Sequence, residues 1–109
     1  MMKLVYVAGA YRSKWGWLGI LVNIWRARRV AQKLWELGFY VICPHLNTAL
    51  FKGRDVVGNH IGYLEGGLEM LQHCQTIYML KGWEKSDGAR AELRLARKLG
   101  LGVMYERET

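Results

Sequence analysis

The sequence predicts a small α/β domain in which a parallel sheet of about four strands carries helices on both faces. Three observations predict this fold class. Short apolar runs alternate with helical segments in the order β-α-β-α-β-α-β. The strand runs are apolar throughout, as in sheets that are buried on both sides. The 109 residues suffice for one such domain, which we expect to span residues 1–109.

The four predicted strands are short apolar runs with clear ends. The first is rich in valine and is followed by Gly9. The second stops before Pro44, which has no N–H to donate to a central ladder. Right-handed crossovers between parallel strands make the arrangement a doubly wound sheet. The strands are predicted at residues 3–8, 39–43, 76–80 and 102–105.

Three helices are predicted between the strands, because apolar residues there recur every three or four positions. Gly38 ends the first helix. The third begins at Ser86 and Asp87 and ends at Gly100, after a cationic last turn. The segments 11–19, 45–58 and 81–85 are expected to be loops. The helices are predicted at residues 23–37, 59–74 and 86–100.

Composition narrows the class of protein. A net charge of +7 favours anionic partners. Much of that charge falls on two helices and is interpreted as solvated helix faces, since no DNA- or RNA-binding motif is present. The sequence contains no run of about 18 apolar residues and therefore predicts no membrane-spanning helix. Cys43 and Cys74 form neither a disulfide framework nor a CxxC motif, which indicates reduced, buried thiols and a cytoplasmic location.

Glu92 stands at the centre of the apolar face of the third helix. No cationic residue lies three or four positions away to pair with it. A buried acid costs several kcal/mol unless it is hydrogen-bonded or used in chemistry. Glu92 also lies on the second turn of the helix that follows the third strand, close to the sheet edge where such folds bind ligands. The residues within about 60° of it on the helix are Gly88, Ala89, Leu95, Ala96 and Leu99.

Other chemistries lack their motifs. The chain has no GxGxxG after its first strand, no GxxxxGK[ST] and no GxSxG. Its three histidines are too scattered for a local zinc pattern. The candidate nucleophiles are therefore a carboxylate or a buried thiol.

Two segments resemble the nucleoside 2-deoxyribosyltransferase superfamily. Tyr6-Val7-Ala8-Gly9-Ala10-Tyr11-Arg12-Ser13 is similar to its first-strand motif, and residues 80–92, LKGWEKSDGARAE, are similar to its nucleophile segment. The second motif is especially similar to a small branch of uncharacterised phage and bacterial proteins, and the chain is also similar to deoxynucleoside 5′-monophosphate N-glycosidases. The resemblance implies a flavodoxin-like fold, a homo-oligomer of two or more subunits, and chemistry that needs no metal or cofactor.

The resemblance also implies the central residues of the site. Glu92 matches the glutamate that attacks the anomeric carbon of a nucleoside and releases the base. A covalent glycosyl ester of this kind divides one displacement into two easier steps. Tyr6 matches a tyrosine that orients the carboxylate through its hydroxyl. The alternative interpretation of Tyr6 is an ordinary half-buried strand residue.

Further residues are expected to bind the sugar and a 5′-phosphate. Gly9 would let the backbone approach the sugar, and Gly88 would leave space beside the carboxylate. Arg12 offers a bidentate guanidinium, and Ser86 offers amides at a helix N-terminus. Arg12 as a solvated loop cation and Ser86 as an ordinary N-cap are the alternatives.

The base is expected to lie near the loop before the third helix. Trp83 could stack on it, or could pack on its own protein. Asp87 or Glu84 could protonate the leaving base, although acids in a first turn also favour the helix dipole. His45 and Asn47, after the second strand, are placed at the same crevice.

Two positions depart from the family pattern. Gly67 and Gln75 stand where the resemblance implies aspartates that help to hold sugar and base. These departures favour a binding module, whereas the resemblance as a whole implies cleavage or transfer at the N-glycosidic bond of a nucleoside or nucleoside 5′-monophosphate. The alternatives are a nucleotide-binding module without turnover and, less favoured, a basic nucleic-acid-binding domain with steeply salt-dependent affinity.

Overall fold

The chain folds around a four-stranded parallel sheet. The computed structural model describes residues 3–11, 13, 15–47 and 63–107. The strand order is β2-β1-β3-β4, and each neighbouring pair is parallel. This arrangement confirms the predicted sheet. The strands are β1 (Leu4–Ala8), β2 (Tyr40–Ile42), β3 (Thr76–Met79) and β4 (Gly102–Tyr105).

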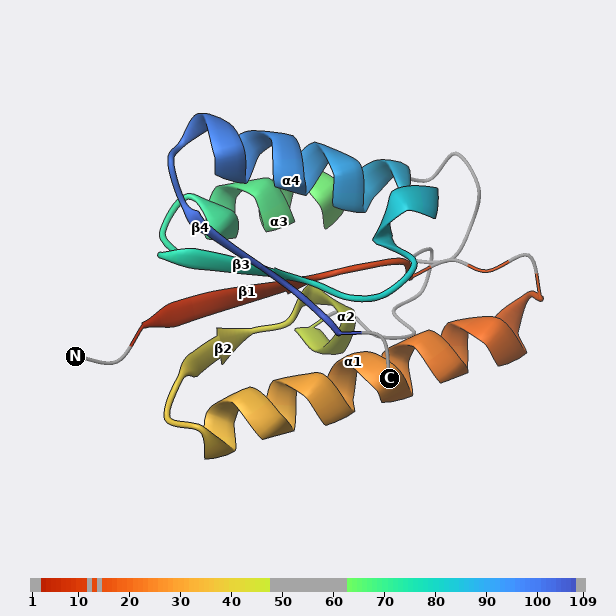
Figure 1. Ribbon diagram of the computed structural model, residues 1–109. Coiled ribbons are helices and arrows are strands. Elements are labelled where there is room, and N and C mark those ends of the chain that lie inside the picture. The colour runs from red at the N-terminus through yellow and green to blue at the C-terminus, as the bar shows by residue number, and fades with distance from the viewer. Residues whose placement is uncertain (1–2, 12, 14, 48–62, 108–109) are drawn as a thin grey trace.

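Helices cover both faces of this sheet (Figure 1). The long helix α1 (Trp17–Glu36) lies on one face. Helices α3 (Tyr63–Leu71) and α4 (Asp87–Lys98) lie on the other. A single turn, α2 (Pro44–Asn47), follows β2, and the 3-10 turn η1 (Trp83–Lys85) precedes α4. The predicted doubly wound, flavodoxin-like architecture is confirmed.

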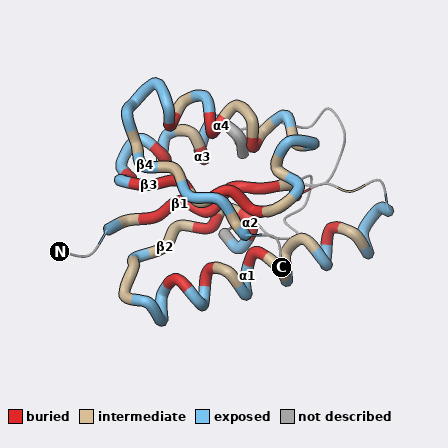
Figure 2. The backbone as a smooth tube through the Cα atoms, in the orientation of Figure 1, coloured by how far each residue is buried: buried red, intermediate tan, exposed pale blue. Residues whose placement is uncertain are grey.

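The central strand β1 divides the core in two. Val5 and Val7 pack on the α1 side of the sheet, whereas Tyr6 and Ala8 pack on the α3 and α4 side. This division follows from the alternation of side chains along a strand. Figure 2 shows the buried residues concentrated along β1 and β3. Tyr6 pairs in register with Ile77 of β3, so its side chain leaves the middle of the sheet on the side that α4 covers.

Helix α1 begins six residues earlier than the sequence predicts, at Trp17 instead of residue 23. Its first turn has Gly16 as N-cap, at φ 70°, and no side-chain cap. Residues 17–22 are apolar except for Gly19, and of these only Ile20 is buried. The segment therefore lacks the apolar–polar period that reveals a surface helix. The predicted loop at 45–58 also begins as α2, and the start of the helix predicted at 59–74 lies outside the described residues.

The end of α4 corrects one residue of the predicted apolar face. The helix ends at Lys98, and Gly100 turns the chain at φ 76°. Leu99 is 46% exposed, and Leu101 packs on the core instead. The apolar face predicted around Glu92 is therefore wrong at Leu99.

Candidate functional site

Helix α4 places Glu92 in the interior. The hydroxyl of Ser86 accepts a hydrogen bond from the N–H of Ala89 at 3.1 Å, which fixes the first turn. Arg90 lies on the outer side, bonded to the Asp87 carboxylate and to the carbonyl of Glu84. The predicted inward position of Glu92 is confirmed, because the residue is only 9% exposed. The inner face consists of Ala89, Glu92, Leu93 and Ala96.

Tyr6 meets Glu92 from the sheet. Its hydroxyl donates a buried hydrogen bond to Oε2 of Glu92, and Tyr6 itself is fully buried. Burial raises the pKa of Tyr6 far above its usual value, and the negative charge of Glu92 raises it further. The phenol therefore stays protonated and remains a donor. The contact fixes the orientation of one carboxylate oxygen.

Gly67 brings α3 against the same pair. A Cβ at this position would lie 2.5 Å from the Tyr6 hydroxyl oxygen and 3.5 Å from Oε2 of Glu92. The first distance is shorter than a real Cβ contact, so any side chain would have to displace Tyr6. At Gly67 the resemblance implies an aspartate. The α3 backbone lies so close to Tyr6 there that it leaves no room for a side chain. Three elements, β1, α3 and α4, converge on one carboxylate.

Gln75, the second departure from the family pattern, lies away from Glu92. It precedes β3, at the amino ends of the strands. Its Oε1 accepts a hydrogen bond of 2.7 Å from the N–H of Leu4. The side chain therefore fixes the beginning of β1, at the sheet edge opposite the one where ligands of this fold bind.

The loop that follows β1 is held by contacts within the protein. A Cβ at Gly9 would lie 2.7 Å from Cβ of Leu80, so a packing contact requires glycine there. The buried His45 places Nε2 2.9 Å from the carbonyl oxygen of Ala10. Its ring also meets Tyr11 edge-on at 5.5 Å. His45 thus fixes the loop after β1. Of the other predicted residues, Arg12 and the side chain of Asn47 lie outside the described part of the chain.

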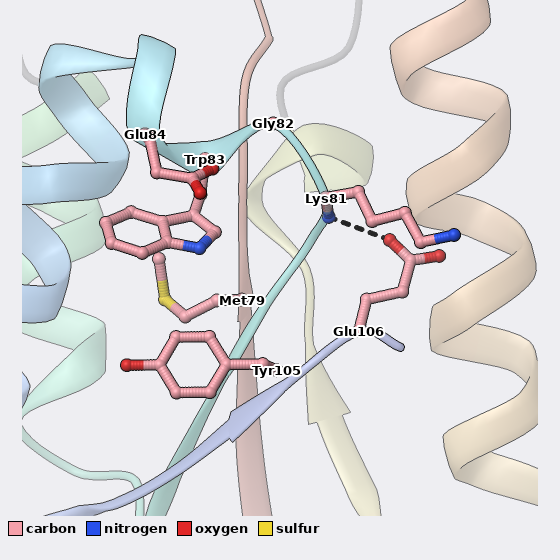
Figure 3. A pocket seen from close by; sticks show the side chains of 7 residues that line it. All are labelled: Met79, Lys81, Gly82, Trp83, Glu84, Tyr105 and Glu106. Atoms are coloured by element: carbon pink, nitrogen blue, oxygen red, sulfur yellow. Dashed lines mark hydrogen bonds between the residues drawn. The ribbon is translucent and has the colours of Figure 1, made fainter. Parts of the chain in front are cut away.

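A hollow of about 280 Å³ opens at the carboxyl ends of β3 and β4 (Figure 3). Trp83 stands at its edge, with its ring 6.0 Å from that of Tyr105 and tilted by 38°. Trp83 also packs on the core cluster that contains Tyr6 and Ala89. Trp83 therefore packs on its own protein, as the alternative interpretation of this residue expects. The lining residues are Met79, Lys81, Gly82, Trp83, Glu84, Tyr105 and Glu106.

Glu106 is a residue of this region that the sequence reasoning missed. It follows β4 directly. Its Oε1 accepts a hydrogen bond of 2.8 Å from the N–H of Lys81 and lies 3.6 Å from the Arg26 guanidinium. Figure 3 shows the first of these bonds on the side of the hollow opposite Trp83. The rule that ligands bind at the carboxyl ends of strands, applied to β4, would have identified Glu106.

Three further findings concern the described residues alone. Among them, no three histidine, cysteine, aspartate or glutamate side chains gather closely enough to hold a metal ion. No helix in the described ranges has the length and apolar character needed to cross a membrane. Both cysteines are free and buried, as predicted.

Comparisons with known proteins agree with this architecture. Residues 3–105 match the model of a family described as "Domain of unknown function (DUF4406)". No curated protein matches the chain. A solved structure of a 2-deoxyribosyltransferase from Bacillus psychrosaccharolyticus superposes with a TM-score of 0.64 at 20% identity, covering 97% of this chain and 77% of that one. The resemblance to the nucleoside 2-deoxyribosyltransferase superfamily is confirmed in the fold.

Proposed function

The chain belongs to the DUF4406 family, and we propose that it cleaves or transfers at the N-glycosidic bond of nucleosides or nucleoside 5′-monophosphates. The observation that carries this proposal is the buried hydrogen bond between Tyr6 and Glu92. A carboxylate held in an almost dry interior costs stability. The carboxylate is nevertheless held in place by the Tyr6 hydroxyl, by the capped helix α4 and by the α3 backbone, which comes close at Gly67. The fold of the 2-deoxyribosyltransferase supports the same reaction class.

In the proposed reaction, Glu92 is the nucleophile. A carboxylate oxygen attacks the anomeric carbon and forms a glycosyl ester, and the base leaves with the electron pair of the N-glycosidic bond and takes up a proton. Water then attacks the same carbon in a hydrolase, or a second base does so in a transferase, and Glu92 is released. Tyr6 acts as a positioning residue, because its donor bond sets the direction of the carboxylate. None of these steps requires a metal or cofactor.

We expect the substrate to enter from the carboxyl ends of β1 and β3. Ser86, at the N-terminus of the twelve-residue helix α4, stands on the Glu92 side of the sheet and is proposed to bind a 5′-phosphate. Trp83, partly buried at the neighbouring hollow, is proposed to contact the base. Asp87 is a weak candidate for the general acid, since its carboxylate faces solvent and bonds to Arg90. Glu84, which lines the hollow beside Trp83, is the other proposed candidate for that role.

A nucleotide-binding module without turnover is the second candidate, because Gly67 replaces an acid of the family pattern. A nucleic-acid-binding domain is less well supported. Two groups of its cationic side chains lie on α1 and α4, and these helices cover opposite faces of the sheet (Figure 1). These two groups do not share one face of the molecule.

Base release from a panel of nucleosides, deoxynucleosides and their 5′-monophosphates tests the proposal. We expect the wild-type chain to release base from at least one member. Glu92→Gln should reduce the rate by roughly a thousandfold or more, because the amide is a poor nucleophile of nearly equal size. Glu69→Gln, an exposed change on α3, is the matched control and should keep the wild-type rate.

Two outcomes would redirect the proposal. Turnover retained in Glu92→Gln would remove Glu92 as nucleophile. Measurable nucleotide affinity in all three proteins, with no base released on long incubation, would favour the binding module.

A further inference from the structure

Glu106 holds the start of the loop that joins β3 to α4. Its Oε1 accepts a hydrogen bond of 2.8 Å from the N–H of Lys81, two residues after β3 ends (Figure 3). The Arg26 guanidinium of α1 lies 3.6 Å from the same oxygen and donates a longer bond, of 3.5 Å, to the carbonyl of Lys81. Charged side chains therefore engage both polar groups of the Lys81 backbone. We call this group the Glu106 clamp; it consists of Arg26, Lys81 and Glu106.

The loop that follows the Glu106 clamp has little packing of its own. None of the three residues of η1 is buried. Gly82 turns the chain at φ 86°, and a Cβ there would meet nothing within 4 Å. A segment with few buried contacts opens easily unless hydrogen bonds fix it. A hydrogen bond to a carboxylate is about twice as strong as one between neutral groups, so we expect the clamp to fix the start of this loop.

The two faces of the sheet hold different parts of the loop. Glu106 pairs with Arg26 of α1, which covers one face. Tyr105, the preceding residue, has its ring 6.0 Å from that of Trp83, and Trp83 packs on the core cluster beneath α4. The N–H of Ser86, the N-cap of α4, then donates a bond of 3.0 Å to the carbonyl of Trp83. The loop is thus held at its start from the α1 side and at its middle from the α4 side.

We propose that Glu106 is a positioning residue for the ligand-binding loop of the site. The inference rests on the proposed function, in which Trp83 contacts the base and Ser86 binds the 5′-phosphate. Both residues follow the clamp within five positions. Glu92, in contrast, is oriented by its own bond to Tyr6. Loosening the clamp should therefore weaken substrate binding more than it slows the chemical step.

The alternative is that the Glu106 clamp only stabilises the fold. A stability defect lowers the fraction of folded chain, and so it lowers the apparent kcat while KM stays unchanged. A displaced loop raises KM with little change in kcat, because it removes binding that substrate and transition state share. The two kinetic parameters therefore separate a positioning role from a purely structural one.

Steady-state kinetics with a deoxynucleoside 5′-monophosphate that the wild type cleaves test this role. Glu106→Ala should raise KM by about tenfold, which is the scale of one hydrogen bond to a charged group, and should change kcat by less than about threefold. Glu106→Gln keeps an oxygen that can accept the Lys81 N–H, so its KM should stay within about threefold of wild type. Glu69→Ala, which removes an exposed carboxylate of α3, is the matched control and should behave as wild type. A wild-type KM in Glu106→Ala, or a loss confined to kcat, would overturn the proposal.

Hydrogen exchange gives a readout that needs no turnover. In Glu106→Ala the amides of residues 81–86 should exchange about tenfold faster than in the wild type, while those of β1 keep their rates. Equal acceleration throughout the chain, or none in the loop, would overturn the proposal.

The failure of this inference and that of the proposed function are distinguishable. A wild type that releases no base would contradict the proposed reaction alone. The exchange comparison, with calorimetric affinity for the same deoxynucleoside 5′-monophosphates in place of KM, would then still decide the role of Glu106. A local change in exchange with no change in affinity would show that the clamp orders the loop without positioning a ligand, and would overturn the proposal.

Discussion

Helices α1 and α4 both differ from an ordinary surface helix, and they differ from it in opposite ways. Both carry cations outward and both end near a glycine with positive φ, Gly38 and Gly100. Helix α4 turns a carboxylate, Glu92, toward the core. Helix α1 turns tryptophan and leucine toward solvent. Buried polar groups and large exposed apolar faces are the informative exceptions to burial rules. The inward exception is the residue on which the proposed function rests, whereas the outward one exposes large apolar side chains to solvent.

The core clusters beneath the two helices also differ in their polar groups. The cluster under α1 is apolar apart from the Cys43 thiol. The cluster under α4 contains the Tyr6 hydroxyl bonded to Glu92. One strand supplies both sides, since Val5 and Val7 face α1 while Tyr6 faces α4. Tyr6 is thus the residue of β1 that contributes a polar group, and it does so on the α4 side of the sheet.

The largest expected effect concerns the packing around Tyr6 and Glu92. It compares alanine substitutions at two adjacent glycines of α3. Gly67→Ala should lower the free energy of unfolding by about 1 to 3 kcal/mol, because its Cβ would lie 2.5 Å from the Tyr6 hydroxyl oxygen. Gly66→Ala has open space within 4 Å and should raise that free energy by about 0.5 to 1 kcal/mol. Urea unfolding of both variants measures the difference.

The same position discriminates between two explanations of the missing acid. If Gly67 were only a lost aspartate, Gly67→Asp would improve base release. The geometry predicts the opposite, since the new Cβ displaces Tyr6 and the new charge approaches Glu92. A Gly67→Asp chain as stable as wild type and faster in base release would contradict the close packing described for α3.

The inward exception was predictable from the sequence. The spacing of α4 is regular, its ends are marked by Ser86 and Gly100, and a helix with one acid on its apolar side needs no tertiary information to be recognised. The parallel, doubly wound sheet followed from the alternation of apolar strands and helices. Leu99 was misplaced because the helix ends at Lys98 and the next residues leave its axis.

The outward exception was not predictable by the same means. Residues 17–22 are apolar on every side, so no period separates the buried Ile20 from the exposed Trp17. The role of Gly67 was also hidden, because its contact with Tyr6 joins segments 61 positions apart in the chain. The sequence pattern of a helix reveals which of its own faces is apolar and which is polar. It does not reveal which backbone approaches a distant side chain.

The next prediction measures the polar pair itself with a double-mutant cycle. Tyr6→Phe removes the donor to Glu92, and Glu92→Leu leaves the Tyr6 hydroxyl without this acceptor. Each change should cost about 1 to 3 kcal/mol. The double variant Tyr6→Phe/Glu92→Leu should return to within about 1 kcal/mol of wild type, because an apolar pair leaves no stranded group. Additive losses in urea unfolding would show that the two side chains do not stabilise the fold as a pair.

The smallest effect tests the apolar side through its thiol. Burial raises the pKa of Cys43 from 9.0 to about 11. Between these values the unfolded thiol ionises while the folded one keeps its proton, so the unfolded state binds fewer protons and the free energy of unfolding falls as pH rises. The loss should be about 1 kcal/mol near pH 10 and negligible at neutral pH.

Cys43→Ala isolates this loss from the other groups that titrate in the same range. The variant starts from a lower free energy of unfolding, since it loses buried volume, but the difference between wild type and variant should shrink by about 1 kcal/mol from neutral pH to pH 10. Cys74 and the tyrosines are present in both chains and cancel. A difference that does not change with pH would mean that the Cys43 thiol ionises as readily in the folded chain as in the unfolded one. The α1 side of the sheet would then not exclude water from the Cys43 thiol.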